Sequence, residues 1–184
     1  MQDTYFIALA HSDDLSALVT WDGQATSPVA LADPALVVPR NEIPWLRASG
    51  GTAAGKAFFP YDDGSIDDGF AGPVLGVYDG TDITRIDLRP DDDIDPEVGF
   101  GVAFGDGYFV FSADGGDGRE LWVSDGTPAG TRQVADLMPG PAGSNPAELT
   151  WDAARERLIL VAEVPVQGRE ILVIDLVDLL PPPG

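Results

Sequence analysis

The residues best suited to chemistry in this chain are aspartates that stand close together in short segments. Three such acidic segments occur, at 62–68, 91–97 and 114–118. Calcium binds about six to eight oxygens from carboxylates and carbonyls, and glycine lets neighbouring carbonyls converge. Calcium is therefore the one cofactor that the sequence indicates, with candidate metal ligands Asp62, Asp63, Asp114 and Asp117. The full spacing of a helix–loop–helix calcium site is absent, so solvated acidic turns are the favoured interpretation.

No set of catalytic residues stands out beside these aspartates. His11 is the only histidine and there is no cysteine, which excludes a zinc site that needs several such ligands. A Ser-His-Asp arrangement would have to use His11 with Ser12 and Asp13, but neighbours along a strand point to opposite faces. Pairs of carboxylates suit glycoside hydrolysis, although any acidic protein contains them. A non-enzymatic function is therefore favoured.

The tryptophans are candidate platforms for stacking on sugars. Trp122 alternates with Leu121 and Val123, so we expect it to be buried between layers of sheet. Trp45 and Trp151 stand near the ends of their repeats, where an exposed position is more plausible than for Trp122.

Short apolar runs at a nearly fixed period predict the elements that position these residues. The runs begin at Tyr5, Ala57, Tyr108 and Leu158, at spacings of 52, 51 and 50 residues. A second run in each unit closes on aspartate, at Asp22, Asp79, Asp125 and Asp175. A third run ends near an Asp-Leu step, and a fourth strand closes each of the first three units. The third runs cover 29–33, 86–90, 135–139 and 177–181. The fourth runs cover 44–47, 101–104 and 147–151.

A fixed period of this kind indicates one supersecondary unit that is stacked several times. The runs are β-branched and aromatic and are bounded by Gly, Pro, Asp and Ser, which is typical of strands. We therefore predict an all-β, β-propeller-like array of four-stranded antiparallel units, with about three and a half blades. The single repeat domain covers 1–184, with repeats at approximately 4–54, 55–106, 107–156 and 157–184, the last one partial.

The octet from Glu120 to Thr127 reads ELWVSDGT and resembles the ELWxxDGT repeat family of bacterial proteins. The match continues through 130–131, 134–140 and 143–146, and upstream through 111–115 and 118–119. Other units depart from it, since the second keeps only Tyr78 to Thr81 and the fourth keeps Gly168 to Leu172. The resemblance implies propeller-like β repeats in a secreted or surface-exposed bacterial protein, and it implies no catalytic residues. Turn chemistry is the favoured role of the Ser-Asp-Gly-Thr segment.

Charge narrows the classes of partner. The net charge is −21, with 31 acidic and 10 basic residues, which disfavours nucleic acid and anionic membranes because both require basic patches. No apolar run reaches the length of about 18 residues that a membrane span needs, so we expect no membrane insertion. The first residues lack the basic and apolar regions of a signal peptide, and the surface location rests on the family resemblance.

Three functions remain open at this level. The favoured one is a non-enzymatic module for surface binding, adhesion, or contact with a protein or glycan ligand. The alternatives are a carbohydrate-active propeller enzyme that uses Asp and Glu carboxylates, and a calcium-stabilised structural spacer of a larger exported protein. Closed propellers have about four to eight blades, so a partial blade predicts either a homodimer or the continuation of a longer chain.

Overall fold

The computed structural model describes residues 8–12, 15–21, 26–28, 51–61, 74–89, 96–99 and 101–180. These residues form antiparallel strands in four sheets and a single short helix, which confirms the predicted all-β class. The first two sheets contain β1 (Ala8–Ser12), β2 (Leu15–Trp21) and β3 (Thr26–Pro28), then β4 (Gly51–Ala53), β5 (Lys56–Tyr61), β6 (Val74–Tyr78) and β7 (Ile83–Ile86). The last two contain β8 (Gly101–Phe104), β9 (Tyr108–Asp114), β10 (Arg119–Ser124) and β11 (Arg132–Ala135), then β12 (Ala147–Asp152), β13 (Arg157–Val164) and β14 (Gly168–Asp175).

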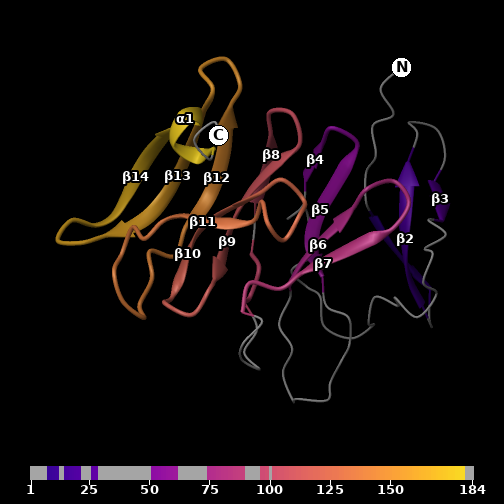
Figure 1. Ribbon diagram of the computed structural model, residues 1–184, viewed down its shortest axis with the longest axis horizontal. Helices are drawn as coiled ribbons and strands as arrows, with labels where there is room; N and C mark the ends of the chain where they lie inside the picture. The colour runs from indigo at the N-terminus through magenta and orange to yellow at the C-terminus, as the bar shows by residue number, and fades with distance from the viewer. Residues whose placement is uncertain are drawn as a thin grey trace.

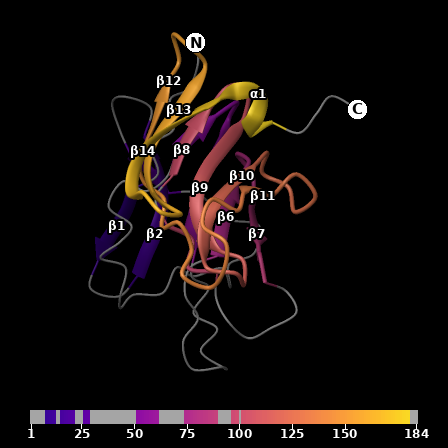
Figure 2. The same cartoon turned by 90° about the vertical axis from the view of Figure 1, so that its left-hand side faces the viewer.

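The four sheets stand side by side in chain order and do not close into a ring (Figure 1). Figure 2 shows the row from the end of the last sheet, with β12, β13 and β14 toward the viewer. Each strand pairs with its neighbours in sequence, so every sheet is a meander. The first strands of successive sheets lie together, because β8 contacts both β4 and β12.

The predicted fourth strands pair differently from the expectation. β8 and β12, expected to close the second and third units, instead begin the next sheets and pair with β9 and β13. Only the three residues 105–107 connect β8 to β9, whereas a longer segment separates β8 from β7. Hairpin pairing through a short connection is favoured, and the sequence periods alone do not reveal to which side a strand pairs. The predicted strand over 44–47 lies outside the described residues.

The alignment of the units is also corrected by one residue. Asp79 and Asp125 directly follow β6 and β10, and Asp175 ends β14, so these three strands correspond. In the antiparallel pairing, the residue directly before each of these aspartates lies opposite Ala57, Phe109 and Leu158, respectively. Phe109, not Tyr108, is therefore the counterpart of Ala57 and Leu158. Both are aromatic, so composition does not distinguish them, although a slip of one residue exchanges the two faces of a strand. Tyr5 lies outside the described residues.

Two hydrophobic cores form between neighbouring sheets, with β9 between them. Its odd-numbered residues Phe109, Phe111 and Ala113 pack with Phe58, Leu75 and other residues of the sheet β4–β7. Its even-numbered Val110 packs with Leu121, Val123, Leu158 and Leu160, which joins it to the sheet β12–β14. Because β9 is buried on both faces, its run of apolar residues is continuous and does not alternate with polar ones.

The chain after β14 forms a helical turn, where the sequence predicts a strand over 177–181. Helix α1 (Leu176–Leu179) places the buried Leu179 in the second core, and the Arg132 guanidinium donates a 2.7 Å hydrogen bond to the Leu179 carbonyl. The fourth unit has no Asp-Gly-Thr turn after β14. Without that turn the chain does not reverse along β14, which explains the missing strand.

Replacing Phe109 by alanine tests both the core and the corrected register. The Phe109 ring stacks on Phe58 at 5.1 Å and on Phe111 at 5.5 Å between ring centroids, and the residue is fully buried. We expect Phe109→Ala to lower the free energy of unfolding by about 3–5 kcal/mol. Tyr108→Ala, which removes a partly exposed ring, is the control and should cost clearly less. Urea unfolding measures both, and equal losses would contradict the register.

Candidate functional site

Glu120 is a buried carboxylate at the start of the signature octet, and it holds a loop in place. Its side chain is only 1 % exposed. The backbone N–H groups of Leu137, Met138 and Ser144 donate to its two oxygens at 3.2, 3.3 and 2.8 Å, and the Ser144 hydroxyl donates at 2.5 Å. Burying a carboxylate is costly unless hydrogen bonds compensate for the lost water. Glu120 thus binds the connection between β11 and β12 to the start of β10.

The same loop contacts two sheets. Asn145 donates its backbone N–H to the Arg119 carbonyl at 3.0 Å, and Glu163 of β13 donates its N–H to the Ser144 carbonyl at 2.7 Å. Gly143 has a positive φ of 61° and lies against the backbone of Arg119, where a Cβ would meet the carbonyl oxygen at 2.6 Å. A side chain at 143 would therefore push the loop away from β10.

The Ser-Asp-Gly-Thr segment acts in turn formation, as its sequence predicts. The Asp125 carboxylate accepts hydrogen bonds from the Thr127 N–H at 2.8 Å and from its hydroxyl at 2.7 Å. Ser124 accepts from the Gly126 N–H at 3.0 Å and shares a 2.7 Å hydrogen bond with the Thr131 hydroxyl. The Asp125 carbonyl accepts a 2.5 Å hydrogen bond from Lys56 of β5, so this turn also joins two sheets.

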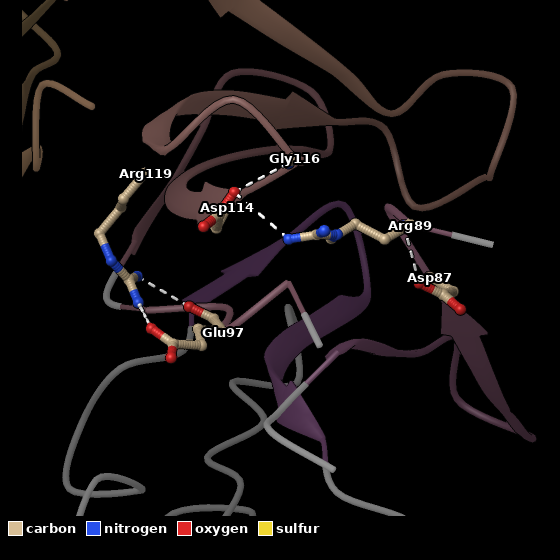
Figure 3. Close-up of polar contacts among 6 residues, drawn as sticks. All are labelled: Asp87, Arg89, Glu97, Asp114, Gly116 and Arg119. Carbon is tan, nitrogen blue, oxygen red and sulfur yellow. Dashed lines mark hydrogen bonds and ion pairs between the residues drawn. The ribbon is translucent and has the colours of Figure 1, made fainter. Parts of the chain in front are cut away.

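The predicted metal ligand Asp114 lies at the end of β9 in a set of polar contacts (Figure 3). Its carboxylate accepts a 2.8 Å hydrogen bond from the Gly116 N–H and lies 3.6 Å from the Arg89 guanidinium. On the other side of this group, Arg119 donates to the Glu97 carbonyl at 2.7 Å and to its carboxylate at 2.5 Å. We call these loops, at 87–89, 96–99 and 114–118, the loop face.

Only two of the four predicted calcium ligands, Asp114 and Asp117, lie among the described residues. Asp117 is exposed in the turn between β9 and β10, near Asp114, whereas Asp62 and Asp63 lie outside the described residues. Among the described residues no three acidic or other metal-binding side chains group around a common point. Calcium at these positions stays a prediction.

The tryptophans occupy packing positions where their side chains are described. Trp122 packs against the first core, as predicted, and its ring would meet a Cβ placed at Gly115. Trp151, expected to be more exposed, is half-buried against the second core with its ring centroid 4.7 Å from that of Phe104. The hairpin pairing of β12 with β13 places Trp151 in this interface, which its position in sequence did not indicate. Trp45 lies outside the described residues.

Sequence reasoning missed Glu120 as an organising residue, although a signal was present. Glu120 stands in the same strand as the apolar residues Leu121, Trp122 and Val123 and directly before them. Such a residue is rarely buried unless it has partners. The partners come from 137–144, a loop whose path the sequence does not reveal.

Comparison with known proteins supports the fold and nothing finer. No family model and no curated protein matches the chain. The crystal structure of TolB from Acinetobacter baumannii is similar with a TM-score of 0.53 and 14 % sequence identity, over 91 % of this chain and 37 % of TolB. The TolB neighbour is a β-propeller, and the chain matches little more than a third of its length. Within the described part of this chain, no helix has the length and apolarity needed to cross a membrane.

Glu120→Gln tests the carboxylate contacts, because the amide would turn an N–H₂ group toward backbone donors. We expect a loss of about 1–3 kcal/mol in the free energy of unfolding, the cost of leaving a buried donor unpaired. Glu170→Gln is the matched control, since Glu170 occupies the same place in the Gly-Arg-Glu triplet of the fourth unit but is exposed; it should change stability by less than about 0.5 kcal/mol. Equal effects in urea unfolding would refute the role of Glu120.

Asp79 provides a test by pH. The N–H groups of Asp82 and Thr81 donate to its carboxylate at 2.9 and 2.8 Å and lower its pKa below the ordinary value. A lowered folded-state pKa stabilises the fold above the unfolded-state pKa of about 3.9, and this contribution disappears as the pH falls through the folded-state pKa.

We therefore expect Asp79→Ala to lower the urea midpoint at neutral pH and to approach the wild-type midpoint in strong acid. Asp106→Ala, which removes an exposed turn aspartate, controls for the change in net charge. A gap between Asp79→Ala and wild type that stays constant down to low pH would contradict this explanation.

Proposed function

We propose that this chain is a β-propeller-like repeat module of the ELWxxDGT type that binds a protein or glycan ligand without catalysing a reaction. The module is a single domain over 1–184 with about three and a half blades. Its repeats lie near 4–54, 55–106, 107–156 and 157–184. Support for the architecture comes from the row of antiparallel sheets and from the similarity to the TolB fold.

One observation carries the non-catalytic proposal: the polar signature residues are used in holding the scaffold. Glu120 binds the loop before β12, and Ser124, Asp125 and Thr127 hydrogen-bond within their own turn. A motif whose polar atoms are used in this way supports a frame, and the loops between its strands are then free to vary and to bind.

The loop face is the binding surface in this proposal. Arg119 pairs there with Glu97, whose side chain remains 68 % exposed, and the largely buried Arg89 holds the Asp114 carboxylate, whose side chain is 33 % exposed. Guanidinium and carboxylate groups held at a surface offer several hydrogen-bond donors and acceptors to the hydroxyl and amide groups of a glycan or a protein loop. The extracellular or cell-surface location is part of the proposal and follows from the family resemblance.

A ligand screen tests this function directly. The immobilised chain is exposed to a glycan array and to purified surface proteins, and each hit is titrated by calorimetry. We expect Asp117→Ala, at the exposed tip of the loop face, to weaken binding at least about tenfold, equivalent to 1.4 kcal/mol. Asp106→Ala, in the turn between β8 and β9, is the matched control and should leave binding unchanged. Equal binding by both variants and wild type would remove the loop face from the proposal.

The same glycans separate binding from catalysis. Incubation with the unmodified chain should release no reducing ends. Hydrolysis that a single carboxylate substitution abolishes would overturn the non-enzymatic proposal and establish the carbohydrate-active alternative.

A further inference from the structure

The last sheet presents an apolar face to the outside of the row. We call it the outward face and define it by Ile159 and Val161 of β13 with Ile171 and Val173 of β14. These residues pair across the two strands, Ile159 opposite Val173 and Val161 opposite Ile171. Ile171 is 72 % exposed and Val173 is 52 % exposed, whereas the alternate residues Leu172 and Ile174 pack into the second core.

The residues that correspond to the outward face in the preceding repeat are buried. Gly118-Arg119-Glu120 and Gly168-Arg169-Glu170 correspond, as do Asp125 and Asp175, at one spacing of 50 residues. Ile171 and Val173 are therefore the counterparts of Leu121 and Val123, which are 0 % and 1 % exposed because the sheet β12–β14 covers them. The register likewise makes Ile159 the counterpart of the buried Val110. The outward face thus repeats a surface that a neighbouring sheet buries within this chain.

The edge of the last sheet is open in the same place. In the preceding sheet β11 pairs with the outer side of β10, Trp122 opposite Gln133. In the described part of the last sheet β14 is the end strand, and the chain turns into α1 without pairing along it (Figure 1). An end strand of eight residues with exposed β-branched side chains is a template for pairing with another chain.

The sheets at the two ends of the row differ in which strands they contain. β2 ends directly before Asp22 and so corresponds to β6, β10 and β14. The described first sheet, β1-β2-β3, therefore contains counterparts of the second, third and fourth strands, and the last sheet contains the first, second and third. Among the described residues, each end sheet of the row therefore has three strands, where the two inner sheets have four.

We propose that the outward face binds a second copy of this chain, whose first sheet continues the row as the last sheet continues the third. The inference rests on the correspondence of repeats and does not depend on the ligand-binding proposal. Two copies supply eight sheets, which is within the range of about four to eight blades in closed propellers. A head-to-tail contact of this kind closes a ring when the rotation between copies permits.

Charge sets the conditions for this association. Each copy carries a net charge of −21, so two copies repel each other at low ionic strength. On the outward face itself Glu163 lies 3.7 Å from Arg169, which balances charge at one end of the apolar patch. Screening with salt should therefore favour association, because the Debye length falls from about 10 Å at 0.1 M to about 3 Å at 1 M.

Light scattering after size exclusion tests the proposal with the full chain at both salt concentrations. We expect a mass of twice 19.4 kDa that is favoured by high protein concentration and by salt. Val173→Asp should weaken association at least tenfold. Val166→Asp is the matched control, because Val166 is fully exposed in the turn between β13 and β14 and lies outside the outward face. If Val173→Asp unfolds by circular dichroism, Ile171→Thr replaces it, since threonine keeps the β-branched shape.

The outcomes separate clearly. A dimer that Val173→Asp or Ile171→Thr disrupts and Val166→Asp preserves supports the proposal. A monomer under all conditions overturns it, and so does a dimer that is insensitive to the substitutions on the outward face or equally sensitive to Val166→Asp.

Discussion

The hydrogen bonds to the Glu120 carboxylate are the interaction on which the arrangement of the last two sheets depends. Burying this charge is tolerable only because three backbone N–H groups and one hydroxyl donate to it. Those donors belong to the loop that leads into β12, and the same loop accepts a hydrogen bond from Glu163 of β13. A continuous series of contacts therefore runs from β10 through Ser144 to the next sheet, so the signature residue of one unit positions the unit that follows.

This role explains how the units differ. The second unit lacks the Glu-Leu-Trp part of the signature but keeps Asp79, whose carboxylate organises the turn after β6. The fourth keeps Glu170, which is exposed, and in the described part of the chain β14 is followed by α1. The turn aspartate and the loop-binding glutamate are thus separate devices. The aspartate carboxylate acts within its own turn, whereas Glu120 acts between the third sheet and the sheet that follows it.

Strand positions and turn chemistry were predictable from the sequence because they depend on local residue patterns. The Asp-Gly turns, the strands around them and the strand at Ala147–Asp152 all agree with the structure. Three features were not predicted: the pairing of β8 with β9, the equivalence of Phe109 to Ala57 and Leu158, and the helical turn after Asp175. Each depends on long-range pairing or on a missing turn, and apolar composition does not encode them. The contacts of Glu120 were missed for the same reason, since their partners lie 17 to 24 residues away.

In a repeat protein, an exposed apolar residue can be compared with the residue at the same position of another repeat. An isolated exposed valine or isoleucine needs no explanation, because much of any protein surface is apolar. Ile171 and Val173 differ because Leu121 and Val123, their counterparts one unit earlier, are buried. The sequence keeps these positions β-branched or aliphatic although nothing in the described chain covers them. Beside them Glu163 and Arg169 form an ion pair, so these two opposite charges balance each other at the apolar face. The last sheet therefore retains the apolar character of an internal sheet on its outward face.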